Sequence, residues 1–545
     1  MTIALASAFH PRGEIPRLAK FLPPLRDAYA RLCVSVPPTA SADDVNALRA
    51  LNIAVAVTRD WSHGRHAALQ LALESNAAHI HYADLDRLLR WIETRPNEWR
   101  AMVERAQQCD GLIVGRTARA YATHPRALVE TEAISNLVGS YLLGAIDAAT
   151  RRHGDTANTL VPLHRVAASP RQPFIAAVDL PTGLNPDTGA LDPATVNADL
   201  TITFAFPKIG QVIFPGARAV GELVIADIGI RAEWASEIEI EVATARKVAA
   251  LIPARPRDSH KGTFGKAMLC VGSANYVGAA FLAGSAATRA GAGLVTLALA
   301  QTIYPMLASA LHETTFVILP DERGVLTPDA TSVLGNSLED YDALLIGCGF
   351  GRDVRTIAFV QTLLNQITNY ERFARITNLV FDADALFALA QTREWWTQLA
   401  PHTAILTPHP GEMATLTGLT RAEVQANRVE IAKKFAAQWQ QIVVLKGAHT
   451  IIAAPDASTP LSARVMIIPI ATPALATAGT GDVLAGTIVA MLAQKLSPFD
   501  AASAGAYLHG LAGMIAEKEI GAAGVIASDL LSRLPEAMRR VQLSR

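Results

Sequence analysis

Short apolar runs that alternate with helical stretches are the feature that most constrains this chain. Six such runs occur in the C-terminal half, and most are followed closely by glycine, proline or aspartate and then by a helical pattern. This rhythm predicts a parallel sheet with helices on both faces. The runs are residues 267–271, 293–298, 343–346, 379–381, 404–406 and 442–445.

Polar motifs follow five of these six runs. In open α/β sheets, ligands bind outside the carboxyl ends of the strands. Because so many motifs share this position, their agreement predicts a binding site at one edge of the sheet more strongly than any single motif does. The motifs are Gly272-Ser273, GCGFG at 347–351, DAD at 382–384, TPHPGE at 407–412 and Lys446-Gly447.

A glycine turn at 476–482 (ATAGTGD) opens directly into an apolar helical run at 483–492. Free backbone N–H groups at a helix start attract anions, and the helix dipole adds to this attraction. Asp482 would place a carboxylate beside the bound anion, an arrangement that suits phosphoryl transfer. The alternative is an ordinary glycine-rich N-cap with Asp in the first turn, where acidic residues are favoured anyway.

Composition excludes several classes of protein. A net charge of −1 over 545 residues gives no global field that would favour nucleic acid. The four cysteines form no C-x-x-C pair, which argues against a disulfide framework and fits a reducing cytoplasm. No apolar stretch reaches the ~20 residues that a membrane span needs. We therefore expect a cytoplasmic protein, with neither nucleic acid nor membrane as partner, and we expect a homo-oligomer.

The segment 231–261 is interpreted as a connector that leads into the C-terminal domain. Pro253 and Pro256 lie too close together for a helix interior or a central strand. Upstream, predicted strands at 174–180, 200–204 and 221–228 form a smaller unit, and strands at 2–7, 53–57, 78–81 and 111–114 precede it. The expected division is an α/β segment at 1–143, a second segment at 144–241 and a C-terminal domain at 242–545.

The segment from about 260 to 534 resembles the ADP-dependent NAD(P)H-hydrate dehydratases, members of the ribokinase-like superfamily. These enzymes remove water from NADH or NADPH whose nicotinamide ring has been hydrated. The resemblance implies an α/β fold with a three-layer ribokinase-like domain at the C-terminus. It rests on HKGTFGK at 260–266, GAA at 278–280, RAGAGLV at 289–295, DADAL at 382–386, TPHPGE at 407–412, KGAHT at 446–450 and AGTGD at 478–482.

The resemblance also implies roles for individual residues. Asp482 would be the general base, ADP the phosphoryl donor, and Mg²⁺ the ion that neutralises phosphate charge. The metal ligands stay unassigned, because Asp382 and Asp384 either help to position magnesium or cap the next helix. His409 has a structural alternative as well, as a ring satisfied by local hydrogen bonds. The implied substrate-binding residues are Ala279, Gly349, His409 and Asp482, and the implied nucleotide-binding residues are Lys446, Gly447, Ala448, His449, Thr450, Gly479 and Gly481.

The segment 177–189 looks like part of an NAD(P)H-hydrate epimerase, and the runs at 203–208 and 226–230 continue the match. This resemblance implies a partial Rossmann-like segment. The Asn-Asn-Gly-Gly-Asp-Gly loop that binds the pyrophosphate in that family is absent from the whole chain. Thr182 stands in place of a serine that helps to hold a potassium ion. Asp179 and Thr182 are thus the remnant of an epimerase site, and we expect epimerase activity to be weak or lost.

The first segment carries a D-x-D pair, Asp84 and Asp86, after a predicted strand. With DGLIVGR at 110–116, it weakly resembles a nucleotide-sugar transferase of the GT-A type, whose D-x-D holds a divalent metal. The alternative is two solvated carboxylates at the start of a helix, where the dipole favours them.

The leading hypothesis is ADP-dependent dehydration of (6S)-NAD(P)H-hydrate, a repair reaction on a small-molecule substrate. The first alternative is a small-molecule kinase of the same superfamily, which would keep the phosphate on its product. A non-catalytic nucleotide-binding protein is the second, and turnover of ADP would exclude it.

Overall fold

The computed structural model describes 3–114 without 12, 59–66, 69–70, 73, 76, 78, 84, 95, 98, 101–102 and 104–110, then 174–228 without 194, 230–369 without 231, 236 and 237, 378–455 and 463–544. The D-x-D carboxylates and Arg116 lie outside the described part. The chain divides into two compact units, which are described one at a time. The first comprises 1–211 and 215–230, and the second comprises 212–214 and 231–545.

The first unit opens with a parallel four-stranded sheet in the order β3-β2-β1-β4. Alternating apolar residues on its strands and on the neighbouring helices form a buried core that includes Leu5, Leu18, Leu48 and Leu89. The predicted α/β character of this segment is confirmed. The elements are β1 (Ile3–Ala8), α1 (Ile15–Ala28), β2 (Arg31–Val36), α2 (Ala42–Ala50), β3 (Ala54–Val57), β4 (His79–Tyr82) and α4 (Leu85–Thr94).

A second parallel sheet in this unit has the order β5-β6-β7-β8. Its strands are β5 (Gly111–Val114), β6 (Phe174–Val178), β7 (Leu200–Phe204) and β8 (Glu222–Ala226). The strand β5 pairs with β6, although we had placed it in the preceding segment. A boundary at residue 143 would therefore divide one sheet, because strand pairing joins residues that are far apart in the sequence.

The second unit is built on a ten-stranded sheet in the order β12-β11-β10-β15-β16-β17-β18-β19-β20-β9. All six runs that the sequence predicted as strands lie in it. Every residue of β15 to β18 is buried, as expected for strands covered on both faces. The strands are β9 (Ile240–Val242), β10 (Lys266–Cys270), β11 (Leu294–Ala300), β12 (Thr315–Leu319), β15 (Ala343–Ile346), β16 (Leu379–Phe381), β17 (Ala404–Leu406), β18 (Ile442–Leu445), β19 (Ile451–Pro455) and β20 (Ala463–Ile467).

The sheet is not wholly parallel, which corrects the expectation from the sequence. Strands β12 to β18 are parallel, but β19 pairs antiparallel with both β18 and β20. The two turns around β19 are too short to hold a crossover helix, so the chain has to reverse direction. The edge strand β9 pairs with β20 and precedes α8 (Ala245–Leu251).

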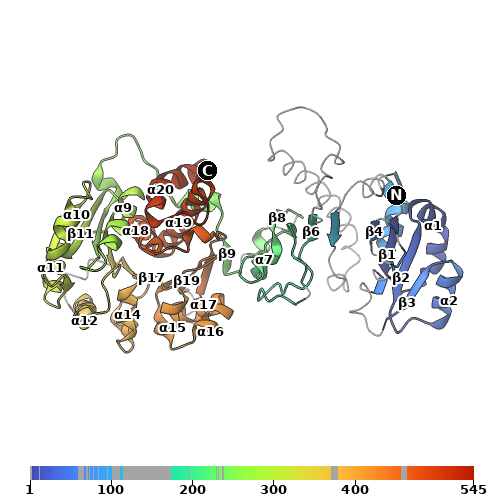
Figure 1. Cartoon of the computed structure of the whole chain (residues 1–545), viewed down its shortest axis with the longest axis horizontal. Helices are drawn as coiled ribbons and strands as arrows, with labels where there is room; N and C mark the ends of the chain where they lie inside the picture. Colours follow the sequence, from blue (N-terminus) through green and yellow to red (C-terminus); the bar gives the residue numbers. More distant parts are fainter. Residues whose placement is uncertain are drawn as a thin grey trace. The chain divides into compact units, whose positions relative to one another are not determined.

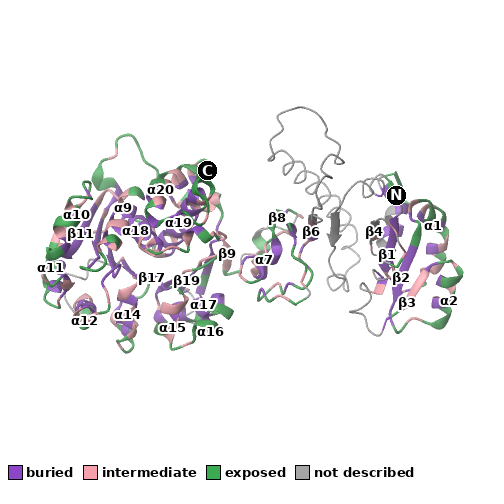
Figure 2. Ribbon diagram, in the orientation of Figure 1, coloured by how far each residue is buried: buried purple, intermediate pink, exposed green. Residues whose placement is uncertain are grey.

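Helices cover both faces of this sheet (Figure 1). On one face, α18 packs against α9, α19, β10 and β15, and α20 packs against α9 and α19. On the other, α12, α14 and α15 follow one another and α17 packs on β18, β19 and β20. Figure 2 shows the strands buried between these layers. The three-layer α/β fold is confirmed. The helices are α9 (Val277–Arg289), α10 (Tyr304–Ala308), α11 (Ala330–Ser337), α12 (Val354–Asn369), α14 (Asp384–Ala390), α15 (Pro410–Thr417), α16 (Arg421–Ala426), α17 (Arg428–Trp439), α18 (Thr480–Ala493), α19 (Pro498–Ile520) and α20 (Ala527–Gln542).

Candidate active site

The candidate site centres on the first turn of α18, the helix that the sequence predicted to start at a glycine turn. Gly479 is the N-cap residue and has φ 89°, a left-handed conformation that favours glycine. Within the described chain, the backbone N–H groups of Gly481 and Asp482 donate no hydrogen bond to a protein acceptor. These two groups and the positive end of the helix dipole are therefore available to an anion.

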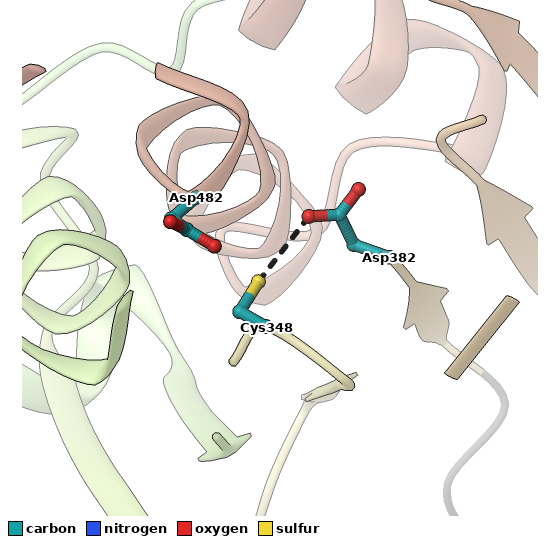
Figure 3. Close-up of side chains that lie close together, drawn as sticks. All are labelled: Cys348, Asp382 and Asp482. Atoms are coloured by element: carbon teal, nitrogen blue, oxygen red, sulfur yellow. Dashed lines mark hydrogen bonds between the residues drawn. The ribbon is translucent and has the colours of Figure 1, made fainter. Parts of the chain in front are cut away.

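Asp482 faces a second carboxylate across a buried thiol (Figure 3). Cys348 and Asp382 follow the strands β15 and β16, and Asp482 comes from α18. One ligand-type atom from each of the three residues lies within 4.8 Å of the other two. The sheet edge and the helix start thus bring together groups that are 134 residues apart in the chain, from 348 to 482.

The surroundings of Asp482 keep its carboxyl group protonated up to about neutral pH. Burial and the negative charge of Asp382 raise the pKa of Asp482 to about 7, although the Cys348 thiol and the Lys446 charge oppose the rise. Burial and the two carboxylates raise the pKa of Cys348 well above its usual value. The thiol is therefore protonated, and its Sγ donates to Oδ2 of Asp382 at 3.4 Å. A carboxyl group with a pKa near 7 is suited to general-base catalysis.

Lys446 supplies the positive charge that balances Asp382. Its Nζ atom donates to Oδ1 of Asp382 at 2.8 Å and lies 3.7 Å from Oε2 of Glu412. Thr407 Oγ1 donates to the same Oδ1 atom at 2.6 Å. Burial would lower the pKa of Lys446, but the two carboxylates outweigh burial and raise it. A Cβ atom on Gly481 would lie only 3.6 Å from Nζ, so the ammonium also adjoins the anion-binding turn.

His409 caps α15, and both interpretations of this residue agree with its position. Its Nδ1 atom accepts hydrogen bonds from the backbone N–H groups of Gly411 and Glu412, both at 3.0 Å. Glu412 completes a capping box by accepting from the backbone N–H of His409 at 2.8 Å. Because Nδ1 is an acceptor, the neutral ring carries its proton on Nε2. The side chain is 56% exposed, so this Nε2 can meet a ligand.

Ala279, on α9, and Gly349, in the loop after β15, lie against each other. A Cβ atom built on Gly349 would come within 2.6 Å of the Ala279 Cβ, so only glycine fits at 349. Ser273 fixes the same loop, since its Oγ donates to the carbonyl of Gly349 at 2.8 Å. Ala279 lies on α9, which packs against α18, the helix that carries Asp482.

The segment 446–450 follows β18, and hydrogen bonds from Arg428 hold its backbone. The Arg428 guanidinium is buried and donates to the carbonyls of Ala448 at 2.6 Å and Leu445 at 3.1 Å. Burial lowers the pKa of Arg428 to about 10, which leaves it charged at neutral pH. The Thr450 hydroxyl closes the turn on the carbonyl of Gly447 at 3.1 Å. Backbone atoms of this segment are thus fixed before any nucleotide binds.

His449 is engaged within the second unit. Its Nδ1 atom lies 2.9 Å from the carbonyl oxygen of Val212, and its ring centroid lies 5.2 Å from that of Phe214. Burial lowers the pKa of His449, so the ring is neutral at pH 7. The expected nucleotide contact at this residue would therefore use its backbone or its second ring nitrogen.

Asp382 and Asp384 differ in what they hold, although the sequence placed them in one motif. Asp382 is buried among Lys446, Thr407 and Cys348. Asp384 instead accepts from the backbone N–H of Gly351 at 2.8 Å, and its Oδ1 lies 3.6 Å from Nε of Arg352. Asp384 thus shapes the glycine loop at 347–351, whereas Asp382 belongs to the cluster with Asp482.

The epimerase remnant lies in the first unit. Asp179 is fully buried, and its Oδ1 atom accepts from Lys208 Nζ at 2.5 Å and from Thr203 Oγ1 at 3.2 Å. Thr182 lies exposed in the turn that follows. The carboxylate of Asp179 is therefore already balanced by an internal cation.

Sequence reasoning missed several residues of the site. Cys348 and Glu412 were inside recognised motifs but had no assigned role, and Thr407 was treated only as part of its motif. The capping-box pattern, His followed three residues later by Glu, could have drawn attention to Glu412. No local pattern marks Arg428, because its partners lie 17 and 20 residues away on another turn.

Two family profiles match separate parts of the chain. The profile of the NAD(P)H-hydrate dehydratase family matches 267–536, and that of the YjeF-related protein N-terminus matches 62–210. The chain is 42% identical to the bifunctional NAD(P)H-hydrate repair enzyme of Moorella thermoacetica over 370 residues, which cover 67% of each chain. It is 36% identical to that of Escherichia coli over 367 residues, 66% of this chain and 64% of the relative.

A solved structure is similar to the second unit. The ADP/ATP-dependent NAD(P)H-hydrate dehydratase of Bacillus subtilis, co-crystallized with ATP and Mg²⁺, is 32% identical, with a TM-score of 0.46. It covers 56% of this chain and 99% of its own. Among the described residues, none of the helices has the length and apolar character of a membrane span.

Proposed function

Because this chain belongs to the family of bifunctional NAD(P)H-hydrate repair enzymes, we propose that its second unit dehydrates (6S)-NAD(P)H-hydrate at the expense of ADP. The observation that carries this proposal is Asp482, whose pKa lies near 7 at the head of a turn with two free N–H groups. A general base thus lies beside an anion-binding turn, and activation of a hydroxyl by phosphoryl transfer requires both.

The proposed reaction has two steps. Asp482 accepts the proton of the ring hydroxyl while the oxygen of that hydroxyl forms a bond to the β-phosphorus of ADP, and the bond from that phosphorus to the bridging oxygen breaks to release AMP. In the second step the neighbouring ring carbon loses a proton to water and the ester C–O bond breaks, so the phosphate leaves as inorganic phosphate. This elimination restores the dihydronicotinamide double bond. Phosphate is a far better leaving group than hydroxide, which is why a nucleotide is consumed.

The free N–H groups of Gly481 and Asp482 would contact the transferring phosphoryl group, and the Lys446 ammonium lies beside them. These donors are fixed before the reaction, so they stabilise developing charge without reorganising. The rest of the nucleotide would lie along 446–450, which Arg428 holds in place. His409 would donate from Nε2 to the substrate.

The donor set fits a magnesium ion. Asp382 Oδ2 and the Asp482 carboxylate are hard oxygen ligands, the type that Mg²⁺ prefers, whereas the protonated Cys348 thiol is not a ligand for it. When bound there, the ion would neutralise charge on the phosphates.

We propose that epimerase activity is weak or absent. Asp179 is paired with Lys208, but the glycine-rich pyrophosphate loop is missing from the sequence. If a potassium ion binds at this remnant, Thr182 would help to hold it. The cytoplasmic location and the homo-oligomer remain predictions.

Incubation with purified S- and R-hydrates, with and without ADP, tests both parts of the proposal. The expected result is ADP-dependent formation of NAD(P)H from the S-hydrate and slow loss of the R-hydrate at its spontaneous rate. A stable phosphate ester without formation of NAD(P)H would indicate a kinase of the same superfamily. Equal consumption of both hydrates at low enzyme concentration would overturn the epimerase assignment.

A further inference from the structure

A cavity of about 320 Å³ lies next to the loop that carries Gly349 and has no role in the proposed reaction. Its volume is within the range of small-molecule sites. The loop links it to the reacting centre, because Cys348 contacts the carboxylate cluster and Gly351 lines the cavity. Three Cα–Cα steps separate these residues, so they are at most about 11 Å apart. The lining includes Ser273, Asn275, Tyr276, Arg323, Phe350 and Arg352.

Most charges around the cavity are already compensated. Asp353 forms a two-point ion pair with Arg355, which also binds Glu322 at 2.8 Å. Arg352 lies 3.6 Å from Asp384. Arg323 differs from these residues, since its exposed guanidinium has no hydrogen bond or ion pair within the described ranges. A cation at the mouth of a cavity is thus left for an external anion.

The backbone at Arg323 is strained for its residue type. Arg323 has φ 54° and Gly324 has φ 78°, in the two-residue turn between β13 (Asp321–Glu322) and β14 (Val325–Leu326). Hairpins of this kind favour Asn-Gly or Asp-Gly, because the left-handed conformation is unfavourable for most other residues that carry a Cβ atom. An arginine that adopts it without a hydrogen bond or ion pair to any other described residue is best explained by a contact with a ligand.

An aromatic side chain, that of Tyr276, also lines this cavity. Tyr276 is 52% exposed, although large aromatic side chains are usually buried. Its ring faces Gly351, where a Cβ atom would lie 3.6 Å from Tyr276 Cε2. An exposed aromatic ring beside an arginine suits a base and a phosphate of one nucleotide.

We propose that this cavity binds the adenosine half of the hydrated dinucleotide, with Arg323 on one of its phosphates and Tyr276 against its adenine. The assignment rests on the proposed function, which puts the nicotinamide half at Asp482. A substrate whose ring reacts there must extend its other half away from the reacting centre. The cavity at the far end of the same loop is a place within reach for it.

The test uses Arg323→Asn in the full chain, because asparagine removes the charge but tolerates the left-handed turn. Loss of a charge-assisted hydrogen bond predicts a rise of about 5- to 30-fold in KM for the hydrate, with kcat and the KM for ADP unchanged. Arg323→Lys should recover part of the affinity. Arg393→Asn, at another exposed arginine, is the matched control.

The choice of substrate identifies the phosphate. If Arg323→Asn raises the KM for NADPH-hydrate alone, Arg323 contacts the 2′-phosphate. If it raises the KM for NADH-hydrate equally, Arg323 contacts the pyrophosphate. Tyr276→Leu should weaken the binding of both hydrates. An unchanged KM for both hydrates in Arg323→Asn would overturn the proposal, as would a rise in the KM for ADP instead.

Direct binding of NADPH, followed by its own fluorescence, separates this proposal from the proposed function. If the parent chain binds NADPH but turns over no hydrate, the dehydratase assignment fails while the cavity can still be tested. If the parent is active and Arg323→Asn binds NADPH as tightly as the parent, the cavity assignment alone fails.

Discussion

The Nζ atom of Lys446 lies 2.8 Å from Oδ1 of Asp382, and this buried pair joins the end of β18 to the end of β16. The side chains of Lys446 and Asp382 are only 17% and 2% exposed. The pair stands between the expected nucleotide loop and the carboxylate of Asp482. It therefore links the stability of the sheet edge to the electrostatics of the candidate base.

Asp482→Asn should abolish dehydration and leave nucleotide binding nearly intact. The amide keeps the size of the side chain but cannot accept a proton, and loss of a general base costs about 10²–10⁴-fold in rate. Turnover of the S-hydrate and the Kd for ADP are the measurements, with the exposed Asp340→Asn as control. Activity within a few-fold of the parent would refute the assignment of Asp482.

Stability should depend on pH through Asp482. Its pKa is about 7 in the folded chain against an ordinary aspartate value of about 3.9, so the folded state favours the protonated carboxyl. The stabilising contribution is full below about pH 4 and is lost as pH rises through 7. Compared with the parent, Asp482→Asn should therefore gain about 1–3 kcal/mol in free energy of unfolding between pH 5 and pH 8. Urea denaturation of both proteins at pH 5 and pH 8 measures this effect. An equal difference in free energy of unfolding between variant and parent at the two pH values would contradict it.

Lys446→Met should destabilise the chain by about 3–5 kcal/mol, because it leaves Asp382 buried without its cation. The double variant with Asp382→Asn removes both charges and should recover much of the loss. Chemical denaturation of the two variants gives the comparison. If the double variant is as unstable as Lys446→Met, the loss comes from packing and not from the unpaired carboxylate.

Arg428→Met should raise the KM for ADP more than the KM for the hydrate. The guanidinium fixes the carbonyl of Leu445, just before the expected nucleotide loop, and that of Ala448 within it, and methionine fills the space without donating. Steady-state kinetics with each substrate varied in turn is the measurement. Arg421→Met, at an exposed arginine on α16, should leave both constants unchanged. An equal effect on the two substrates would point to general loss of structure.

A fragment of 231–545 should fold and retain dehydratase activity, whereas a fragment of 243–545 should be less stable. Apart from the short segment 212–214, the second compact unit begins at residue 231, and β9 covers the edge of the sheet by pairing with β20. Thermal unfolding of both fragments tests this, since an exposed edge strand also promotes aggregation. Equal melting temperatures would show that β9 contributes little.

Local patterns were sufficient for much of the fold. The six apolar runs of the C-terminal half predicted six strands, β10, β11 and β15 to β18, because these strands are almost wholly buried and leave continuous apolar sequence. They could not predict β9, which has three residues at an edge, nor the antiparallel pairing of β19. Edge strands lack a strong hydrophobic pattern, and strand direction depends on the length of the connections.

The sequence alone also determined which chemistry to expect at Asp482, because a glycine turn that leads into an apolar helix dictates its own local backbone. The sequence could not give the pKa of that carboxyl, the protonated Cys348 between the two aspartates, or the separation of Asp382 from Asp384. Nor could it show that Arg428 holds the segment 446–450 or that Arg323 has no hydrogen bond or ion pair among the described residues. Those properties depend on distances between residues far apart in the chain, and only the packing of sheet and helices sets these distances.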